Sequence, residues 1–138
     1  VFQALRRVGV GSVMDRSFVQ VRQRIAPDRA REILKDNPAH LLIEGDGDSW
    51  MLMPAVELAK YLESEDREDP AAVIDLFLIP AERLQIARIQ LQANLQEAWA
   101  LFEETAAEAL VVERMTAPGI RRVYGILMPN TVEKSYRY

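Results

Sequence analysis

The stretch LLIEGDGDSWMLMP, residues 41–54, decides the fold, because LVVERMTAPGIRRVYGILMP, residues 110–129, repeats its order of elements. In both stretches an apolar segment ends in Glu, a turn follows, and a second apolar segment ends in Leu-Met-Pro. Short apolar segments bounded by Gly, Asp or Pro are typical of β-strands joined in a hairpin. The sequence therefore predicts two copies of one hairpin unit.

Each hairpin is preceded by a predicted strand and helix and is followed by another helix. The first copy has a strand at 18–21, a helix at 27–35 and a closing helix from Pro54 to about Glu63, and the second has a strand at 86–91 and helices that begin at Asn94 and Pro129. Asn94 and Glu97 have the spacing of a capping box. A β-α-β-β-α unit buries only one face of its sheet. The predicted fold class is therefore α+β, with two repeats packed around a pseudo-twofold axis.

Three anchors align the two repeats. They are Ala30 with Ala98, LLIE at 41–44 with LVVE at 110–113, and Leu-Met-Pro at 52–54 with Leu-Met-Pro at 127–129. The offsets are 68, 69 and 75. We therefore expect the second hairpin to carry six extra residues, in a longer loop that holds Pro118 and Gly119.

The boundaries of the repeats follow from this alignment. The first repeat is predicted at 8–64 and the second at 74–138, with an acidic linker at 65–73 between them. The linker begins with a run of acidic residues and continues through Pro70, a composition typical of a solvated connection.

The composition excludes several classes of function. With no cysteine and a single histidine, His40, the chain has no thiol nucleophile, no cysteine zinc site, no Ser-His-Asp triad and no two-histidine metal site. The formal net charge of −4 disfavours nucleic acid as a partner. No apolar run approaches the ~20 residues that span a bilayer. We therefore expect no catalytic residue, no metal site and no enzyme.

Arg114, Arg121 and Arg122 lie close together in the second predicted hairpin. They predict a small basic surface that suits a phosphate, an acidic lipid headgroup or an acidic protein segment. Ordinary solvated surface is the alternative interpretation of these residues.

Several stretches resemble a known family. SVM at 12–14, LQEA at 95–98, EALVV at 108–112 and YGIL at 124–127 resemble a tandem CBS-domain pair, over nearly the whole chain. More narrowly, VGSVMDRS at 10–17, IPAERL at 79–84 and ERMTAPG at 113–119 resemble the C-terminal cytoplasmic CBS pair of bacterial voltage-gated chloride channels of the ClC family.

The resemblance implies a regulatory and dimerisation domain. It would be a soluble domain of an integral membrane protein, at the cytoplasmic face of the inner membrane, and would couple its conformation to ion transport. Its partners would be a second copy, in a homodimer, and the membrane domain of the parent channel. Two alternatives stay open: an adenine-nucleotide-sensing CBS module of a non-channel parent, such as an enzyme or a magnesium transporter, and a dimerisation scaffold that binds no ligand.

The resemblance also implies where ATP, ADP or AMP would bind in family members that take a nucleotide, in the cleft between repeats. Their third strand ends in Gly, two apolar residues, Thr or Ser, two residues and Asp. Through the Leu-Met-Pro anchor, the hydroxyl and acidic positions become Met53 and Val56 in the first repeat and Met128 and Thr131 in the second. A shift of one residue would bring Glu57 to the acidic position.

Because neither acidic position holds an acid in this alignment, the resemblance implies weak or no nucleotide binding. Each lost charge-assisted hydrogen bond would cost roughly tenfold to a hundredfold in affinity. Arg16, Arg83 and Arg88 are the cations that could offset the negative charge of the chain.

Overall fold

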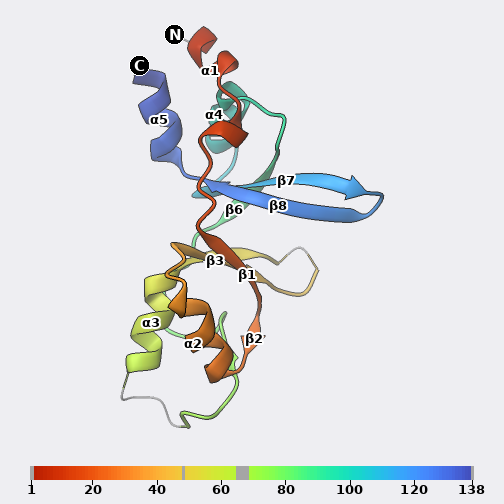
Figure 1. The fold of residues 1–138 in the computed structure, drawn as a ribbon. Coiled ribbons are helices and arrows are strands. Elements are labelled where there is room, and N and C mark those ends of the chain that lie inside the picture. Colours follow the sequence, from red (N-terminus) through yellow and green to blue (C-terminus); the bar gives the residue numbers. More distant parts are fainter. Residues whose placement is uncertain (1, 48, 65–68, 138) are drawn as a thin grey trace. The chain divides into compact units, whose positions relative to one another are not determined.

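The computed structural model describes residues 2–47, 49–64 and 69–137, and these residues form an α+β fold (Figure 1). Five α-helices and eight strands lie within these ranges. The chain divides into two compact units, one of residues 17–84 and one of residues 1–16 together with 85–138. Each unit contains the three-stranded sheet of one repeat, and the two are described separately.

The unit of residues 17–84 is built on a sheet with the strand order β1-β3-β4. Its elements are β1 (Phe18–Arg22), β2 (Arg24–Ile25), α2 (Pro27–Lys35), β3 (His40–Glu44), β4 (Met51–Pro54), α3 (Ala55–Glu63) and β5 (Ile74–Asp75). β1 runs parallel to β3, and β4 runs antiparallel to it. Apolar residues of the sheet, such as Leu41 and Met53, pack with Ala30 of α2 and Leu58 of α3 in one core.

The second unit repeats this arrangement with the strand order β6-β7-β8. Its elements are α1 (Phe2–Arg7), the short 3-10 helix η1 (Val10–Ser12), β6 (Ile86–Gln90), α4 (Leu95–Glu104), β7 (Ala109–Ala117), β8 (Ile120–Leu127) and α5 (Pro129–Arg137). Helices α1, α4 and α5 contact one another (Figure 1). Asn94 and Glu97 form the expected capping box, in which each side chain accepts from the other residue's backbone N–H.

The structure confirms the predicted order β-α-β-β-α in both repeats. Four short elements, α1, η1, β2 and β5, were not predicted. They are too short to show the periodic spacing of apolar residues on which a sequence prediction rests.

A segment at the start of each predicted repeat pairs with the last strand of the other repeat. Asp15 exchanges two backbone hydrogen bonds of 2.8 Å with Ile126 of β8. Leu84 exchanges bonds of 2.7 and 3.2 Å with Leu52 of β4. The limits 8–64 and 74–138 therefore differ from the compact units, in which residues before 17 belong with the second repeat and residues up to 84 belong with the first.

The predicted linker is described only in part. Residues 65–68 lie outside the described residues, and residues 69–73 are exposed. The limits of the linker therefore stay a prediction.

The strand register shows that the Leu-Met-Pro anchor was wrong by one residue. Leu41 pairs with Met53 in the first sheet, and the equivalent Leu110 pairs with Leu127 in the second. Met53 is therefore equivalent to Leu127, an offset of 74 residues. The helices that follow begin at Ala55 and at Pro129, which gives the same offset. The motif misled the alignment because its proline ends a strand in the first repeat and begins a helix in the second.

The expected long loop around Pro118 and Gly119 is also wrong. Strands β7 and β8 continue to the pair Ala117–Ile120, so the loop has only two residues. Gly119 has a φ of 77°, and proline followed by a glycine of positive φ suits a tight turn.

The extra residues of the second hairpin are five in number and lie mostly in the strands. Residues 44–50 separate the paired Ile43 and Met51, whereas residues 113–124 separate the paired Val112 and Gly125. The insertion thus extends a β-ribbon, and a register shift after Val112 accommodates it.

The close approach of residues 14–15 to β8 requires glycine at position 125. A Cβ at Gly125 would lie 2.6 Å from the Cγ and Sδ atoms of Met14 and 3.0 Å from the carbonyl oxygen of Asp15. We predict that Gly125→Ala lowers the free energy of unfolding by about 1–3 kcal/mol, the usual cost of overpacking, as measured by urea denaturation. Gly9→Ala is the control, because its Cβ would meet nothing closer than 4.0 Å. Equal stability of the two variants would contradict the close approach.

Candidate functional site

The candidate sites are the two junctions where the last strand of a repeat meets the following helix. In the first repeat β4 leads into α3, and in the second β8 leads into α5. The observed register makes Pro54 equivalent to Met128 and Glu57 equivalent to Thr131. We call these the first and the second half-site and describe each within its own unit.

Glu57 is the charged residue of the first half-site, in the first turn of α3. Its carboxylate accepts a hydrogen bond of 3.3 Å from the backbone N–H of Glu82 and lies 3.6 Å from the ammonium of Lys60. The Glu57 side chain is only 18% exposed, whereas the neighbouring Val56 is 55% exposed. The helix N-terminus also favours a negative charge at this place. Glu57 is thus an oriented, ionic acceptor.

Arg83 organises the segment that supplies the N–H of Glu82. Its guanidinium donates hydrogen bonds to the carbonyl oxygens of Leu76, Ile79 and Ala81, at 2.9, 2.7 and 3.1 Å. A planar guanidinium can hold three carbonyls at once because its donors point in fixed directions. The next residue, Leu84, is anchored on β4 by its backbone bridge, so the segment is fixed at both ends.

The second half-site has the same backbone but lacks an acid. The first turn of α5 reads Pro-Asn-Thr, and it carries no acidic residue. The backbone N–H of Thr131 donates to the carbonyl of Met128 at 3.1 Å, and both side chains are half-buried. Thr131 offers a neutral hydroxyl where the first repeat offers the carboxylate of Glu57.

The structure places the five predicted site residues at three locations. Val56 and Glu57 share the first turn of α3, and Met128 and Thr131 share the β8–α5 junction. Met53 is fully buried in the core of its unit, like its equivalent Leu127. Pro54 takes the hydroxyl position of the first repeat, which sequence alignment through the Leu-Met-Pro motif did not identify.

Two of the three arginines considered as cations are engaged within their own units. Arg83 binds carbonyl oxygens, and Arg88 pairs with the buried Glu113 at 3.1 Å. Glu113 also lies 4.0 Å from Arg121. Arg16 is exposed.

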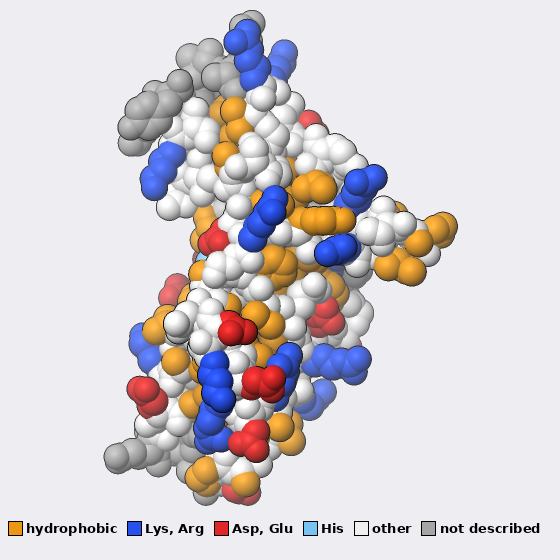
Figure 2. All heavy atoms as spheres, in the orientation of Figure 1, with side chains coloured by type: hydrophobic (Ala, Val, Ile, Leu, Met, Phe, Trp, Pro, Cys, Tyr) orange, Lys and Arg blue, Asp and Glu red, His pale blue; other side chains and the backbone are white. Residues whose placement is uncertain are grey.

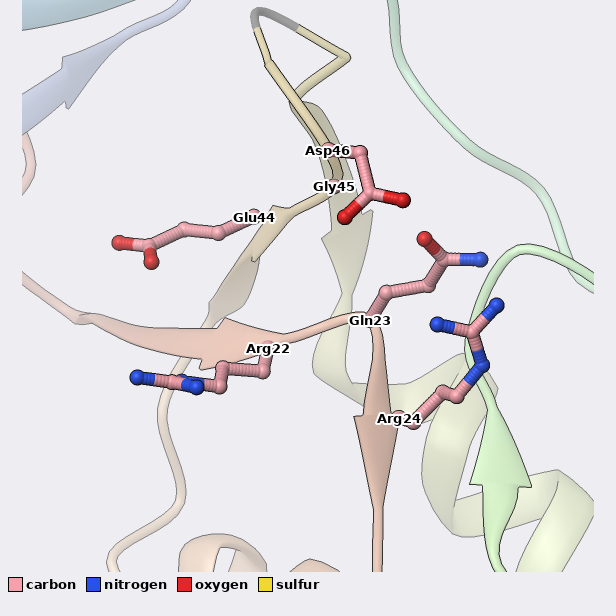
Figure 3. Close-up of a pocket in the computed structure, with 6 residues that line it drawn as sticks. All are labelled: Arg22, Gln23, Arg24, Glu44, Gly45 and Asp46. Atoms are coloured by element: carbon pink, nitrogen blue, oxygen red, sulfur yellow. The ribbon is translucent and has the colours of Figure 1, made fainter.

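A cavity of about 430 Å³ lies at the carboxyl ends of the parallel strands β1 and β3 (Figure 3). Its charged lining residues are Arg22, Arg24, Glu44 and Asp46. The side chains of Arg22 and Glu44 extend to one side, and those of Arg24 and Asp46 extend to the other (Figure 3). Because two cations face two anions, the cavity offers no net charge to select a phosphate.

Two further features concern metal binding and membrane spanning within the described ranges. They hold no group of three or more His, Asp or Glu residues placed to bind a metal ion. None of their helices is long and apolar enough to cross a membrane.

Solved structures with the same architecture identify the fold. The chain superposes on a CBS domain-containing protein from Kribbella flavida with a TM-score of 0.61 at 13% identity, covering 94% of this chain and 98% of that one. The chain has the fold of a CBS-domain pair. A CBS-domain pair from Klebsiella pneumoniae, solved with bound AMP, gives a TM-score of 0.58 at 12% identity and covers 95% and 99% of the two chains.

A third solved structure belongs to a Mg²⁺ channel. It is the cytosolic domain of the Mg²⁺ channel MgtE in complex with ATP, with a TM-score of 0.52 at 15% identity, and it covers 96% of this chain and 51% of that one. The sequence itself matches no family model and no curated protein. At these identities the CBS structures establish the α+β fold with two repeats.

The role of Arg83 can be tested by stability. We predict that Arg83→Met lowers the free energy of unfolding by about 2 kcal/mol, because the partly buried carbonyls of segment 76–81 lose charged donors. The measurement is chemical denaturation of the whole chain. Arg29→Met is the matched control: Arg29 makes a single exposed ion pair, with Glu32, and we expect a change within about 0.5 kcal/mol. If both variants lose the same amount, Arg83 does not organise the segment.

Proposed function

We propose that this CBS pair is a regulatory module that binds one adenine nucleotide per chain, weakly, through the half-site of Glu57. The observation that carries the proposal is the strand register, which aligns Glu57 with Thr131. In the family pattern this position is the acidic residue that holds the ribose. The sequence argument against binding relied on Val56 at this position, and that alignment was wrong.

The surroundings of Glu57 support a role as a ribose acceptor. Its carboxylate is held by the N–H of Glu82 and by Lys60, so little side-chain entropy remains to be lost when a ligand binds. Two carboxylate oxygens provide about four acceptor positions, and these two contacts leave some of them for ribose hydroxyls.

The remaining residues of the pattern predict modest affinity. Pro54 occupies the position of the phosphate-binding hydroxyl and has neither a hydroxyl nor a backbone N–H to donate. The second half-site lacks an acid altogether. We therefore expect binding near the millimolar range, about −4 kcal/mol, with the adenosine part rather than the phosphates carrying recognition.

We further propose that the parent is a ClC-type chloride channel or transporter and that the domain is a homodimer at its cytoplasmic face. The three stretches at 10–17, 79–84 and 113–119 support this parent through their resemblance. A bound nucleotide would act by binding one conformation of the tail more tightly than another, which shifts the transport equilibrium by that difference in affinity.

The parent can be tested on the full-length gene product. The remainder of the open reading frame should encode the membrane domain, and the purified protein in liposomes should conduct or exchange chloride. We expect nucleotide to change the chloride flux of the wild type but not that of the Glu57→Gln protein. A soluble enzyme in the same reading frame would contradict the channel proposal. The homodimer is tested separately, by sedimentation of the 138-residue chain.

Replacing Glu57 tests the ligand. We predict that Glu57→Gln weakens AMP and ATP binding by roughly tenfold to a hundredfold, because a neutral amide gives up charge-assisted hydrogen bonds to the ribose. The measurement is isothermal titration calorimetry. Glu63→Gln at the exposed end of the same helix is the control and removes the same charge. No heat from the wild type, or equal affinity of both variants, would refute the proposal.

Adding an acid to the second half-site tests the alignment of Glu57 with Thr131 by a gain of binding. We predict that Thr131→Asp raises nucleotide affinity at this half-site about tenfold and moves the stoichiometry from one towards two per chain. Asn130→Asp adds the same charge one residue earlier and should change neither quantity. A gain with Asn130→Asp alone would show that the register assignment is wrong.

A further inference from the structure

The β7–β8 ribbon extends past the sheet to which it belongs. β6 pairs with β7 only as far as Gln90–Glu113. Residues 114–123 continue as a two-stranded ribbon, which we call the arm (Figure 1). Within the described part of the chain no third strand pairs with either edge of the arm. The described residues of the equivalent hairpin of the first repeat show no such extension, since β3 ends at Glu44 and β4 begins at Met51.

The arm carries the opposite charge to the chain as a whole. Residues 114–122 read RMTAPGIRR, with three arginines and no acid, and no Asp or Glu follows before Glu133. The arm thus has a charge of +3, whereas the whole chain has −4, which leaves −7 for the other residues. A negatively charged surface would therefore attract the arm and repel the rest of the protein.

Two of these arginines lie directly opposite each other. Arg114 pairs with Arg122 across the ribbon, and like charges at directly opposed positions destabilise a pair of strands. Arg122 lies over the ring of Tyr124, 5.2 Å from its centroid. Arg121 reaches Glu113 only at 4.0 Å. An anion placed between Arg114 and Arg122 would relieve their repulsion.

The end of the arm is apolar. Met115 and Ile120 are 53% and 58% exposed, and Ala117 and Pro118 lie between them. Figure 2 shows the arm standing out from its unit, with hydrophobic side chains at its end and Lys or Arg side chains nearer its base. Arg121 lies opposite Met115, so the end suits a boundary where apolar side chains can enter while a long cationic side chain reaches back to an anion.

From these observations we propose that the arm docks on an anionic lipid bilayer. Met115 and Ile120 would enter the boundary between headgroups and acyl chains, and the arginines would contact lipid phosphates. Four residues of extended chain beyond Glu113 span about 13 Å, which exceeds the 5–10 Å depth of interfacial insertion. Stable attachment to a membrane needs two weak signals together, and the arm has both an apolar end and a basic base.

A second copy of the chain fits the arm less well. Pairing of two arms edge to edge would bring arginines of one copy next to arginines of the other, and charged side chains on an edge strand prevent such pairing. A bilayer accepts the apolar end and the cations at once. Docking of the arm on another surface of a second copy is an outcome that the experiment distinguishes.

The test is cosedimentation of the 138-residue chain with vesicles. We expect binding to vesicles of phosphatidylcholine with a quarter phosphatidylglycerol, no binding to pure phosphatidylcholine, and loss of binding at 0.5 M salt. Arg121→Gln/Arg122→Gln should weaken binding by about 25-fold, since each cation near an anionic surface contributes roughly fivefold. Met115→Ser/Ile120→Ser should weaken it at least tenfold.

Matched controls lie on the other unit. Arg29→Gln/Arg31→Gln removes two exposed arginines of α2, and Leu78→Ser removes a leucine that is 80% exposed. These variants should bind as the wild type does, and thermal unfolding shows that each variant is folded.

Three results would overturn the proposal. They are no binding to anionic vesicles, equal loss with the arm and control variants, and a change in the sedimentation of the lipid-free protein with the arm variants, which would assign the arm to contacts between copies. The proposal is independent of the nucleotide site, since the arm variants should bind AMP as the wild type does.

Discussion

Two short backbone pairings, Asp15 with Ile126 and Leu84 with Leu52, determine how the chain is divided. Each adds one residue of a preceding segment to the free edge of a three-stranded sheet. The apolar residues beside these pairings, Val10 in one unit and Ile79 in the other, then become part of the core. The unit that results is a sheet from one repeat completed by a segment from the start of the other.

This arrangement also positions the chemistry. The segment that ends at Leu84 supplies the backbone N–H that orients Glu57, and the arginine before Leu84 holds that segment together. The orientation of the Glu57 side chain therefore depends on the segment that comes from the other repeat as much as on its own helix. The equivalent position in the other unit holds Thr131, so two repeats with nearly the same backbone differ in the one property, a negative charge, that a ribose would select.

Sequence reasoning predicted the order of elements well, because strong local signals mark them. Pro27 and Pro129 begin helices, and the Asn94 capping box was visible from spacing alone. The register of the strands was harder to predict from the sequence. Side chains in a strand repeat every two residues, but the recurring Leu-Met-Pro motif suggested a pairing that was off by one, and only backbone pairing could correct it. The site assignment inherited that error, since Val56 and Glu57 are adjacent.

The arm and the small elements were missed for a different reason. Polar and apolar residues alternate only over 114–117, and Pro118 and Gly119 interrupt the pattern before Arg121 and Arg122, so the sequence of this stretch favours a loop. They form a ribbon because buried residues on both sides of them, in β7 and in β8, already align the two strands and because Pro118 and Gly119 close the turn tightly. The formation of such a ribbon depends on the buried parts of its two strands and not on the composition of its exposed residues.

The exchange of segments has a consequence for synthesis of the chain on the ribosome. Residues 17–84 are contiguous, so this unit can fold as soon as Leu84 has left the exit tunnel. The other unit joins the first sixteen residues to the last fifty-four, and its sheet is completed by Asp15 meeting a strand more than one hundred residues later. Residues 1–16 are made before residues 85–138 and must therefore wait until those residues appear before they reach their final place.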